Sequence, residues 1–302
     1  MRFRSKLRDN VKRICVGIVI VVLAGCAPVC AAALQRTLWV SIAPLAFVAE
    51  QIGGGHIDVK TLLPDGQDPH IYAPTPRKMR ALLQAGRLLI LGMPFERRLR
   101  EKLEAMHNSL EVVDCSRGVP RRRLRIVDTH LHGSHVDEPV DGDQHIWLGM
   151  EQLKGIAGNV KQALIRIDAG RAADYEAGYT ALLAQCAVVQ AQNSRRLAPH
   201  RGKKIFVYHP AFGYFLETYG LRQKPVEIAG KSPSPKQMAG LMKEAARDHV
   251  TCIFVQPQFD SKSARAIAAA IGGTVVPLDP LAKDVLKNMV HMANEIADAL
   301  QK

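Results

Sequence analysis

Short apolar runs alternate along the chain with longer segments in which apolar residues recur every three or four positions. The runs predict strands and the longer segments predict helices. Because the runs are apolar enough, we expect strands that are buried on both faces, as in a parallel sheet flanked by helices. The alternation occurs twice, so we predict an α/β fold with two lobes, each a mainly parallel sheet. The predicted strands are residues 37–42, 57–63, 87–91, 110–113, 204–208, 224–228, 251–255 and 274–278.

One predicted helix is much longer than the others and separates the two alternating regions. It runs from Asp168, a candidate N-cap, to Leu197, shortly before Pro199. At 1.5 Å per residue it would span about 45 Å, long enough to run along both lobes, although an ordinary long helix within one domain is the alternative. The expected organisation is a signal and lipobox region (1–33), an N-terminal metal-binding lobe (34–167), a connecting backbone helix (168–198) and a C-terminal metal-binding lobe (199–302).

The N-terminus has the layout of a secretory signal. A basic segment precedes residues 14–24, an apolar run of eleven that is too short to span a membrane as a helix. Residues 23–26 resemble a bacterial lipobox, which makes Cys26 the candidate site of a lipid anchor. Cleavage near residues 31–33, three alanines, is the alternative. Both interpretations place the folded part in the periplasm or another extracytoplasmic space.

Composition excludes one class of partner. The formal charge is +13, but the basic N-terminal segment contributes +5 of it, and only 5% of residues are aromatic. Outside that segment the basic residues are dispersed, except for the run at 121–125. We therefore expect no nucleic-acid binding.

The cysteines indicate no thiolate metal site. Three of the six lie in or beside the signal, which leaves Cys115, Cys186 and Cys252 in the folded part. Three cysteines cannot all pair, although an extracytoplasmic location would permit one disulfide. Their spacing does not match a zinc motif.

Four other side chains are candidates for a metal site. His70 follows the second predicted strand, His209 and Asp279 each directly follow a strand, and His145 begins a helix. Ligands of open α/β sheets bind at the carboxyl ends of the strands. Three imidazoles and one carboxylate would make a tetrahedral shell suited to Zn²⁺.

A segment rich in histidine and acids interrupts the N-terminal alternation at residues 116–144. It contains His130, His132 and His135, followed by four acidic residues. We predict a loop there. It is either simply solvated or a weak accessory collector of metal ions.

Several motifs resemble the metal-binding substrate proteins of cluster A-I ABC importers, most of all their zinc branch. The motifs are PDGQDPH at 64–70, His145 before Trp147, HPAFGYFLETYG at 209–220, VQPQF at 255–259 and LDPLA at 278–282. The resemblance covers nearly everything after residue 37. It implies two α/β lobes joined by one long rigid helix, with the metal held between them by His70, His145, His209 and Asp279.

The resemblance and the ligand types together predict the function. We expect a monomeric binding protein that captures Zn²⁺ as its transported ligand and passes it to the membrane permease of an ABC importer. A manganese- or iron-binding protein of the same family is the alternative. The manganese branch also resembles this chain, but it has glutamate where this chain has His209. A surface adhesin is a further reading that the sequence neither supports nor excludes.

A zinc hydrolase is the rival from another class, and we do not expect one. A hydrolase keeps one coordination position open for water, whereas Asp279 would close the shell. No general base is evident; Asp65, Asp68 and Glu217 are the nearest candidates in sequence.

Overall fold

The computed structural model describes residues 36–106, 109–122, 142–227, 231–259 and 262–301. The predicted signal with Cys26, the alternative cleavage region at 31–33 and the histidines at 130, 132 and 135 lie outside the described residues. In the part of the chain that is described, no helix combines the length and the hydrophobicity of a transmembrane span.

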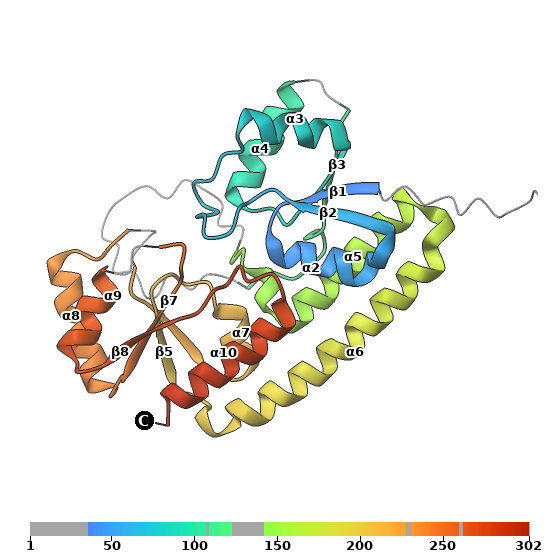
Figure 1. The fold of residues 1–302 in the computed structure, drawn as a ribbon. Coiled ribbons are helices and arrows are strands. Elements are labelled where there is room, and N and C mark those ends of the chain that lie inside the picture. Colours follow the sequence, from blue (N-terminus) through green and yellow to red (C-terminus); the bar gives the residue numbers. More distant parts are fainter. Residues whose placement is uncertain (1–35, 107–108, 123–141, 228–230, 260–261, 302) are drawn as a thin grey trace, which may run out of the picture. The chain divides into compact units, whose positions relative to one another are not determined.

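The N-terminal sheet contains four parallel strands in the order β2-β1-β3-β4 (Figure 1). The first two strands pair in register from Arg36 opposite Ile57 to Val40 opposite Thr61. The elements of this region are β1 (Arg36–Val40), α2 (Ala43–Gly53), β2 (Ile57–Thr61), α3 (Pro76–Ala85), β3 (Arg87–Ile90), α4 (Pro94–Ala105), β4 (Glu111–Asp114) and α5 (Met150–Ile167), with short 3₁₀ turns η1 (Gly54–His56) and η3 (Ile146–Leu148).

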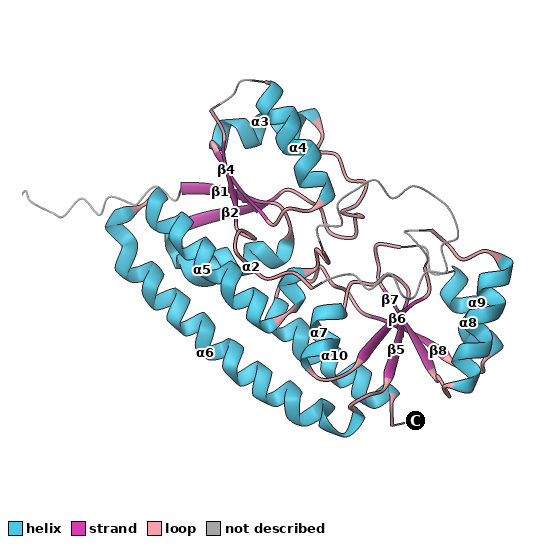
Figure 2. Cartoon of the chain, turned by 180° about the vertical axis from the view of Figure 1, so that it is seen from behind, coloured by secondary structure: helices cyan, strands magenta, loops and turns pink. Residues whose placement is uncertain are grey.

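The C-terminal sheet repeats this arrangement with the parallel order β6-β5-β7-β8 (Figure 2). Both sheets confirm the predicted α/β class. Each predicted strand is present, with ends that differ by no more than a few residues. The elements of this region are β5 (Lys204–Val207), α7 (Gly213–Thr218), β6 (Arg222–Pro225), α8 (Pro235–Arg247), β7 (Cys252–Val255), α9 (Lys262–Ala270), β8 (Thr274–Pro277) and α10 (Val285–Ala299).

Local sequence signals explain where several helices begin. Thr75 precedes Pro76 and accepts a hydrogen bond from the backbone N–H of Lys78, and Ser234 plays the same part before Pro235. Proline has no backbone N–H, and at the first helical position this costs no hydrogen bond. The capping hydroxyl accepts from one of the unpaired N–H groups in the first turn.

The long helix α6 (Ala172–Leu197) contacts α2, α5 and α10, and Figure 1 shows it running beside these helices. Its predicted apolar face is present, with Tyr175, Leu182 and Cys186 buried. Gly178 allows a close approach, because a Cβ there would lie 2.5 Å from the carbonyl oxygen of Ile52 in α2.

The predicted N-cap of this helix, Asp168, lies at the boundary between α5 and the turn that leads into α6. The backbone N–H of Asp168 bonds to the carbonyl of Leu164 at 2.9 Å and so closes the end of α5. A 3₁₀ turn, η4 (Ala169–Arg171), then precedes α6. After α6 a similar turn, η5 (Ala198–His200), leads to β5.

Buried apolar side chains form one large cluster that includes residues of both sheets, and a smaller cluster lies between the C-terminal sheet and helices α8 and α9. Cys115, Cys186 and Cys252 are buried, and none of the three is joined to another in a disulfide. Burial raises the pKa of the Cys186 thiol to about 11 and that of Cys115 further. These thiols therefore act as small apolar side chains.

Candidate metal centre

Three histidine side chains meet through the same ring atom. His70 lies in the loop after β2, His145 immediately precedes η3, and His209 lies just beyond β5. Nε2 of His209 is 3.2 Å from Nε2 of His70 and 3.3 Å from Nε2 of His145. Within the described part of the chain, these three residues form the one group whose candidate ligand atoms all lie within 4.8 Å of one another.

The spacing of these nitrogen atoms fits a shared metal ion. With Zn–N bonds of 2.0–2.1 Å and tetrahedral angles, two ligand nitrogens lie about 3.3 Å apart. The two measured Nε2 separations, 3.2 and 3.3 Å, match that edge. The arrangement therefore brings three nitrogen ligands within reach of one cation, with His209 at the spacing of a tetrahedral edge from each of the other two.

His209 is fixed by its ring and by its peptide group. Its Nδ1 lies 2.8 Å from Oε1 of the buried Glu227. The side chain of Gln256 accepts from the backbone N–H of His209 at 3.0 Å and donates to its carbonyl at 2.8 Å. The ring of Phe259 stacks on the imidazole, with centroids 4.6 Å apart. Because the carboxylate accepts the Nδ1 proton, the lone pair of Nε2 faces the other histidines.

His145 has a carboxylate partner of the same kind. Oδ1 of the buried Asp143 lies 2.8 Å from Nδ1 of His145 and accepts from its backbone N–H at 3.0 Å. Trp147, next in η3, donates from Nε1 to the carbonyl oxygen of Pro280 at 2.7 Å. This bond connects the element that carries His145 to the loop after β8.

His70 lacks a carboxylate at its ring among the described residues. Only its main chain is held, by Asp68 Oδ1 at its N–H and by Arg98 at its carbonyl, both at 2.8 Å. Burial and then the neighbouring His209 and His145 lower the pKa of His70 from 6.5 to about 3. The imidazole is therefore neutral near pH 7, which metal binding requires.

Arg122 stands behind Asp143. Its NH1 donates to Asp143 Oδ2 at 2.7 Å, and its Nε donates to Glu217 Oε2 in α7 at 3.0 Å, with a second bond from NH2 to the other Glu217 oxygen. A Cβ on Gly213 would lie 1.9 Å from NH1, so only glycine leaves room for the guanidinium. Burial alone would raise the pKa of Asp143, but hydrogen bonds from His145 and Arg122 outweigh it and lower that pKa.

Main-chain contacts complete this connection. The backbone N–H of Asp143 donates to the carbonyl oxygen of Arg122 at 2.9 Å. Tyr214, also in α7, donates its hydroxyl proton to the carbonyl of Asp143 at 2.6 Å and accepts from the backbone N–H of Arg122 at 3.0 Å. Helix α7, which belongs to the C-terminal region, thus helps to position His145 of the N-terminal region.

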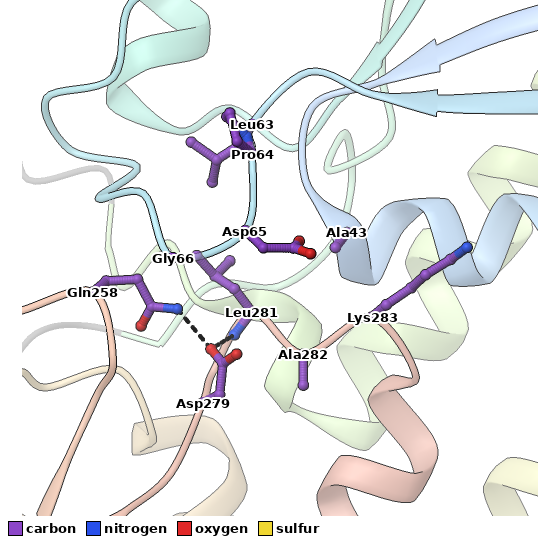
Figure 3. Close-up of a pocket in the computed structure, with 10 residues that line it drawn as sticks. All are labelled: Ala43, Leu63, Pro64, Asp65, Gly66, Gln258, Asp279, Leu281, Ala282 and Lys283. Carbon is purple, nitrogen blue, oxygen red and sulfur yellow. Dashed lines mark hydrogen bonds between the residues drawn. The ribbon is translucent and has the colours of Figure 1, made fainter.

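Asp279, the fourth predicted ligand, lies outside the histidine group in the described structure. Its Oδ1 accepts from Gln258 Nε2 at 2.7 Å and from the backbone N–H of Leu281 at 2.9 Å (Figure 3). It lines a cavity of about 230 Å³ that also contains Asp65 and Lys283. A second cavity, of about 10 Å³, adjoins the three histidines, and Gln258 and Leu281 line both.

The acids considered as general bases have other roles. Asp68 holds the backbone of His70 and Glu217 binds Arg122, while Asp65 lines the larger cavity. None of them lines the small histidine cavity described above.

Sequence reasoning missed the residues that orient the histidines. Asp143 was read only as one acid among several in a loop, and Glu227 as part of a strand. The motif VQPQF at 255–259 supports the family resemblance, but the sequence alone indicates no role for Gln256, Gln258 or Phe259. A carboxylate two residues before His145 was the one local signal available.

Two parallel sheets that contribute loops to a three-histidine site define a solute-binding protein for a metal ion. Residues 39–301 match the family described as "Zinc-uptake complex component A periplasmic", and the chain belongs to that family. Members are extracytoplasmic components of ABC uptake systems, which bind a metal ion for an importer and are not enzymes.

Individual relatives agree with this assignment. The high-affinity zinc uptake system protein ZnuA of Yersinia pestis is 25% identical over 264 residues, which cover 82% of this chain and 83% of that protein. A crystal structure of ZnuA is 32% identical with a TM-score of 0.80, over 88% of this chain and 99% of that one. A zinc-bound ZnuA deletion mutant is also 32% identical, with a TM-score of 0.78 over 88% and 98% of the two chains.

Proposed function

We propose that this protein captures Zn²⁺ outside the inner membrane and delivers it to the membrane permease of an ABC importer. His70, His145 and His209 bind the ion through Nε2, and Asp279 supplies the fourth ligand. The observation that carries this proposal is that Nε2 of His209 lies 3.2 Å from Nε2 of His70 and 3.3 Å from Nε2 of His145. These separations suit ligands of one tetrahedral cation.

The donor set favours zinc over manganese or iron. Zn²⁺ is borderline-soft and is well served by imidazole, whereas Mn²⁺ prefers oxygen ligands. Two of the three imidazoles are held by buried carboxylates, which fix the tautomer and strengthen the nitrogen as a ligand. The relatives described above whose names specify a metal specify zinc.

Other parts of the proposal concern the whole chain. Residues 1–33 form the signal and lipobox region, in which the part before Cys26 directs export and Cys26 carries a lipid anchor, and the mature protein works as a monomer. The regions 34–167 and 199–302 act as two metal-binding lobes, and the segment 168–198 joins them.

The direct test is the metal content of protein purified without added metal. We expect about one zinc per chain by elemental analysis. Competition titrations with Zn²⁺ and Mn²⁺ at one fixed pH then compare the selectivity of wild type and His209→Glu. This substitution puts a carboxylate in place of an imidazole. The zinc-to-manganese affinity ratio should fall without inverting. An unchanged ratio, or a manganese-filled protein, would reject the zinc assignment. His291→Ala, an exposed histidine of α10, is the matched control.

A further inference from the structure

We propose that Gln258 is a positioning residue that holds the carboxylate of Asp279 away from the histidine group. It thereby sets how readily Asp279 completes the shell around a bound cation. This inference rests on the proposed function, since it assigns Asp279 the role of fourth ligand.

The contact between the two side chains is direct. Figure 3 shows the amide of Gln258 pointing at Asp279, with Nε2 2.7 Å from Oδ1. The backbone N–H of Leu281 donates to the same oxygen at 2.9 Å. A hydrogen bond to a charged acceptor is stronger than one between neutral groups. The Gln258 amide is therefore a real competitor for this carboxylate.

The main chain around Asp279 is held independently of Gln258. Asn288 of α10 donates to the carbonyl of Asp279 at 2.8 Å, and Trp147 donates to the carbonyl of Pro280 at 2.7 Å. The backbone N–H of Leu278 bonds to Val255 at 2.8 Å. The carboxylate can therefore turn about its own side-chain bonds while its backbone stays in place.

Gln258 is itself only half satisfied in this arrangement. Its Oε1 is buried and has no hydrogen-bond partner among the described residues. A buried carbonyl oxygen without a donor is unfavourable. Turning the amide away from Asp279 would free Oε1 from this position, which offsets part of the hydrogen bond that is lost, so the released arrangement is a minor but populated one.

The location of Gln258 places it between the two cavities. It lines the larger one with Asp279 and the small one with the histidines. Its neighbours in the loop after β7 are anchored to the site, Gln256 through the peptide group of His209 and Phe259 through its ring. The backbone that carries Gln258 is thus fixed relative to His209, and only its side chain needs to move.

Removing the Gln258 amide should change zinc affinity in the opposite direction to removing a ligand. If only a fraction of molecules presents Asp279 to the cation, the apparent dissociation constant rises by the inverse of that fraction. Removing the amide donor should therefore tighten zinc binding, by about tenfold for a hydrogen bond to a charged group.

The test compares Gln258→Leu with wild type in zinc competition titrations at one pH. Gln258→Asn, whose amide is one methylene too short to reach, should shift affinity in the same direction and covers the case in which leucine impairs folding. The same substitution is then made in an Asp279→Ala background. If Gln258 acts through Asp279, its effect should disappear there.

A spectroscopic readout separates this role from general packing. With Co²⁺ as the probe, visible absorption is stronger in four-coordinate tetrahedral sites than in sites with more ligands. We expect Gln258→Leu to increase this absorption and Asp279→Ala to abolish the increase. Unchanged or weaker zinc binding in both Gln258 variants, or an equal gain without Asp279, would overturn the inference. Failure of wild-type protein to bind zinc through its histidines would instead reject the proposed function.

Discussion

The two buried histidine–carboxylate pairs are alike at the histidine and differ behind the carboxylate. Asp143 and Glu227 each lie 2.8 Å from Nδ1 of their histidine. Asp143 is also bound by Arg122, whereas Glu227 has no lysine or arginine partner in the described part of the chain. The guanidinium of Arg122 withdraws charge from Asp143, so Asp143 should strengthen its histidine as a zinc ligand less than Glu227 does. One pair thus favours rigidity, and the other favours ligand strength.

The largest expected effect tests the likeness of the two pairs. His145→Ala and His209→Ala each remove one nitrogen ligand, and each should weaken zinc binding by about a hundredfold or more, beyond the 10–100-fold typical of residues behind the ligands. Competition with a zinc chelator measures both. Wild-type affinity in either variant would show that its imidazole does not bind the cation.

The two pairs should also differ in how much each carboxylate contributes to the free energy of unfolding of the metal-free protein. Asp143→Asn leaves the half-buried Arg122 with one charged partner fewer, so the free energy of unfolding should fall by about 2–3 kcal/mol. Glu227→Gln strands no cation and should cost about 1 kcal/mol or less. Urea unfolding of both variants without metal checks this. Equal losses would mean that Arg122 contributes little.

His70, the histidine without a carboxylate, should reveal itself through pH. Its pKa is lowered from 6.5 to about 3 in the folded protein. As pH falls below 6.5, the imidazole therefore binds a proton in the unfolded chain but stays neutral in the folded chain. The free energy of unfolding should therefore decrease towards acid. Relative to wild type, His70→Asn should gain about 1–2 kcal/mol between pH 6 and pH 4.5 in metal-free urea titrations. A difference that stays constant with pH would contradict the lowered pKa.

The smallest effect concerns ligand strength alone. Glu227→Gln replaces a full carboxylate by a weaker acceptor and should lower zinc affinity by about tenfold. Asp143→Asn should lower it less, because Arg122 already offsets the charge of that carboxylate. The same competition titration compares the two at a pH where both variants are folded. The reverse order would remove the proposed difference in basicity.

Periodicity was enough to predict the fold because the central strands are short apolar runs and several helices carry clear start signals. The runs that include Leu89, Phe206 and Phe254 are buried almost completely, which is the condition under which such a pattern predicts a central parallel strand. Asp168 stands at the end of α5 and at the start of the turn that leads into α6, so one capping residue marks both boundaries.

The site was only partly predictable, for a physical reason. Strand ends point to the same edge of a sheet, so positions such as His70 and His209 can be inferred from their place after strands. The pairing of Glu227 with His209 cannot, because it depends on side-chain directions from two different strands' ends. The orientation of Asp279 is likewise decided by Gln258, which is 21 residues away in sequence.

The backbone bond between Asp143 and Arg122 has a consequence for how the chain can be altered. It holds the two ends of the segment 123–141 together at 2.9 Å, so the length of that segment is decoupled from the fold on either side. Loop closure becomes only slowly more costly with added residues. The number of residues between Arg122 and Asp143 should therefore be changeable at little cost in stability, as long as this bond between them is kept.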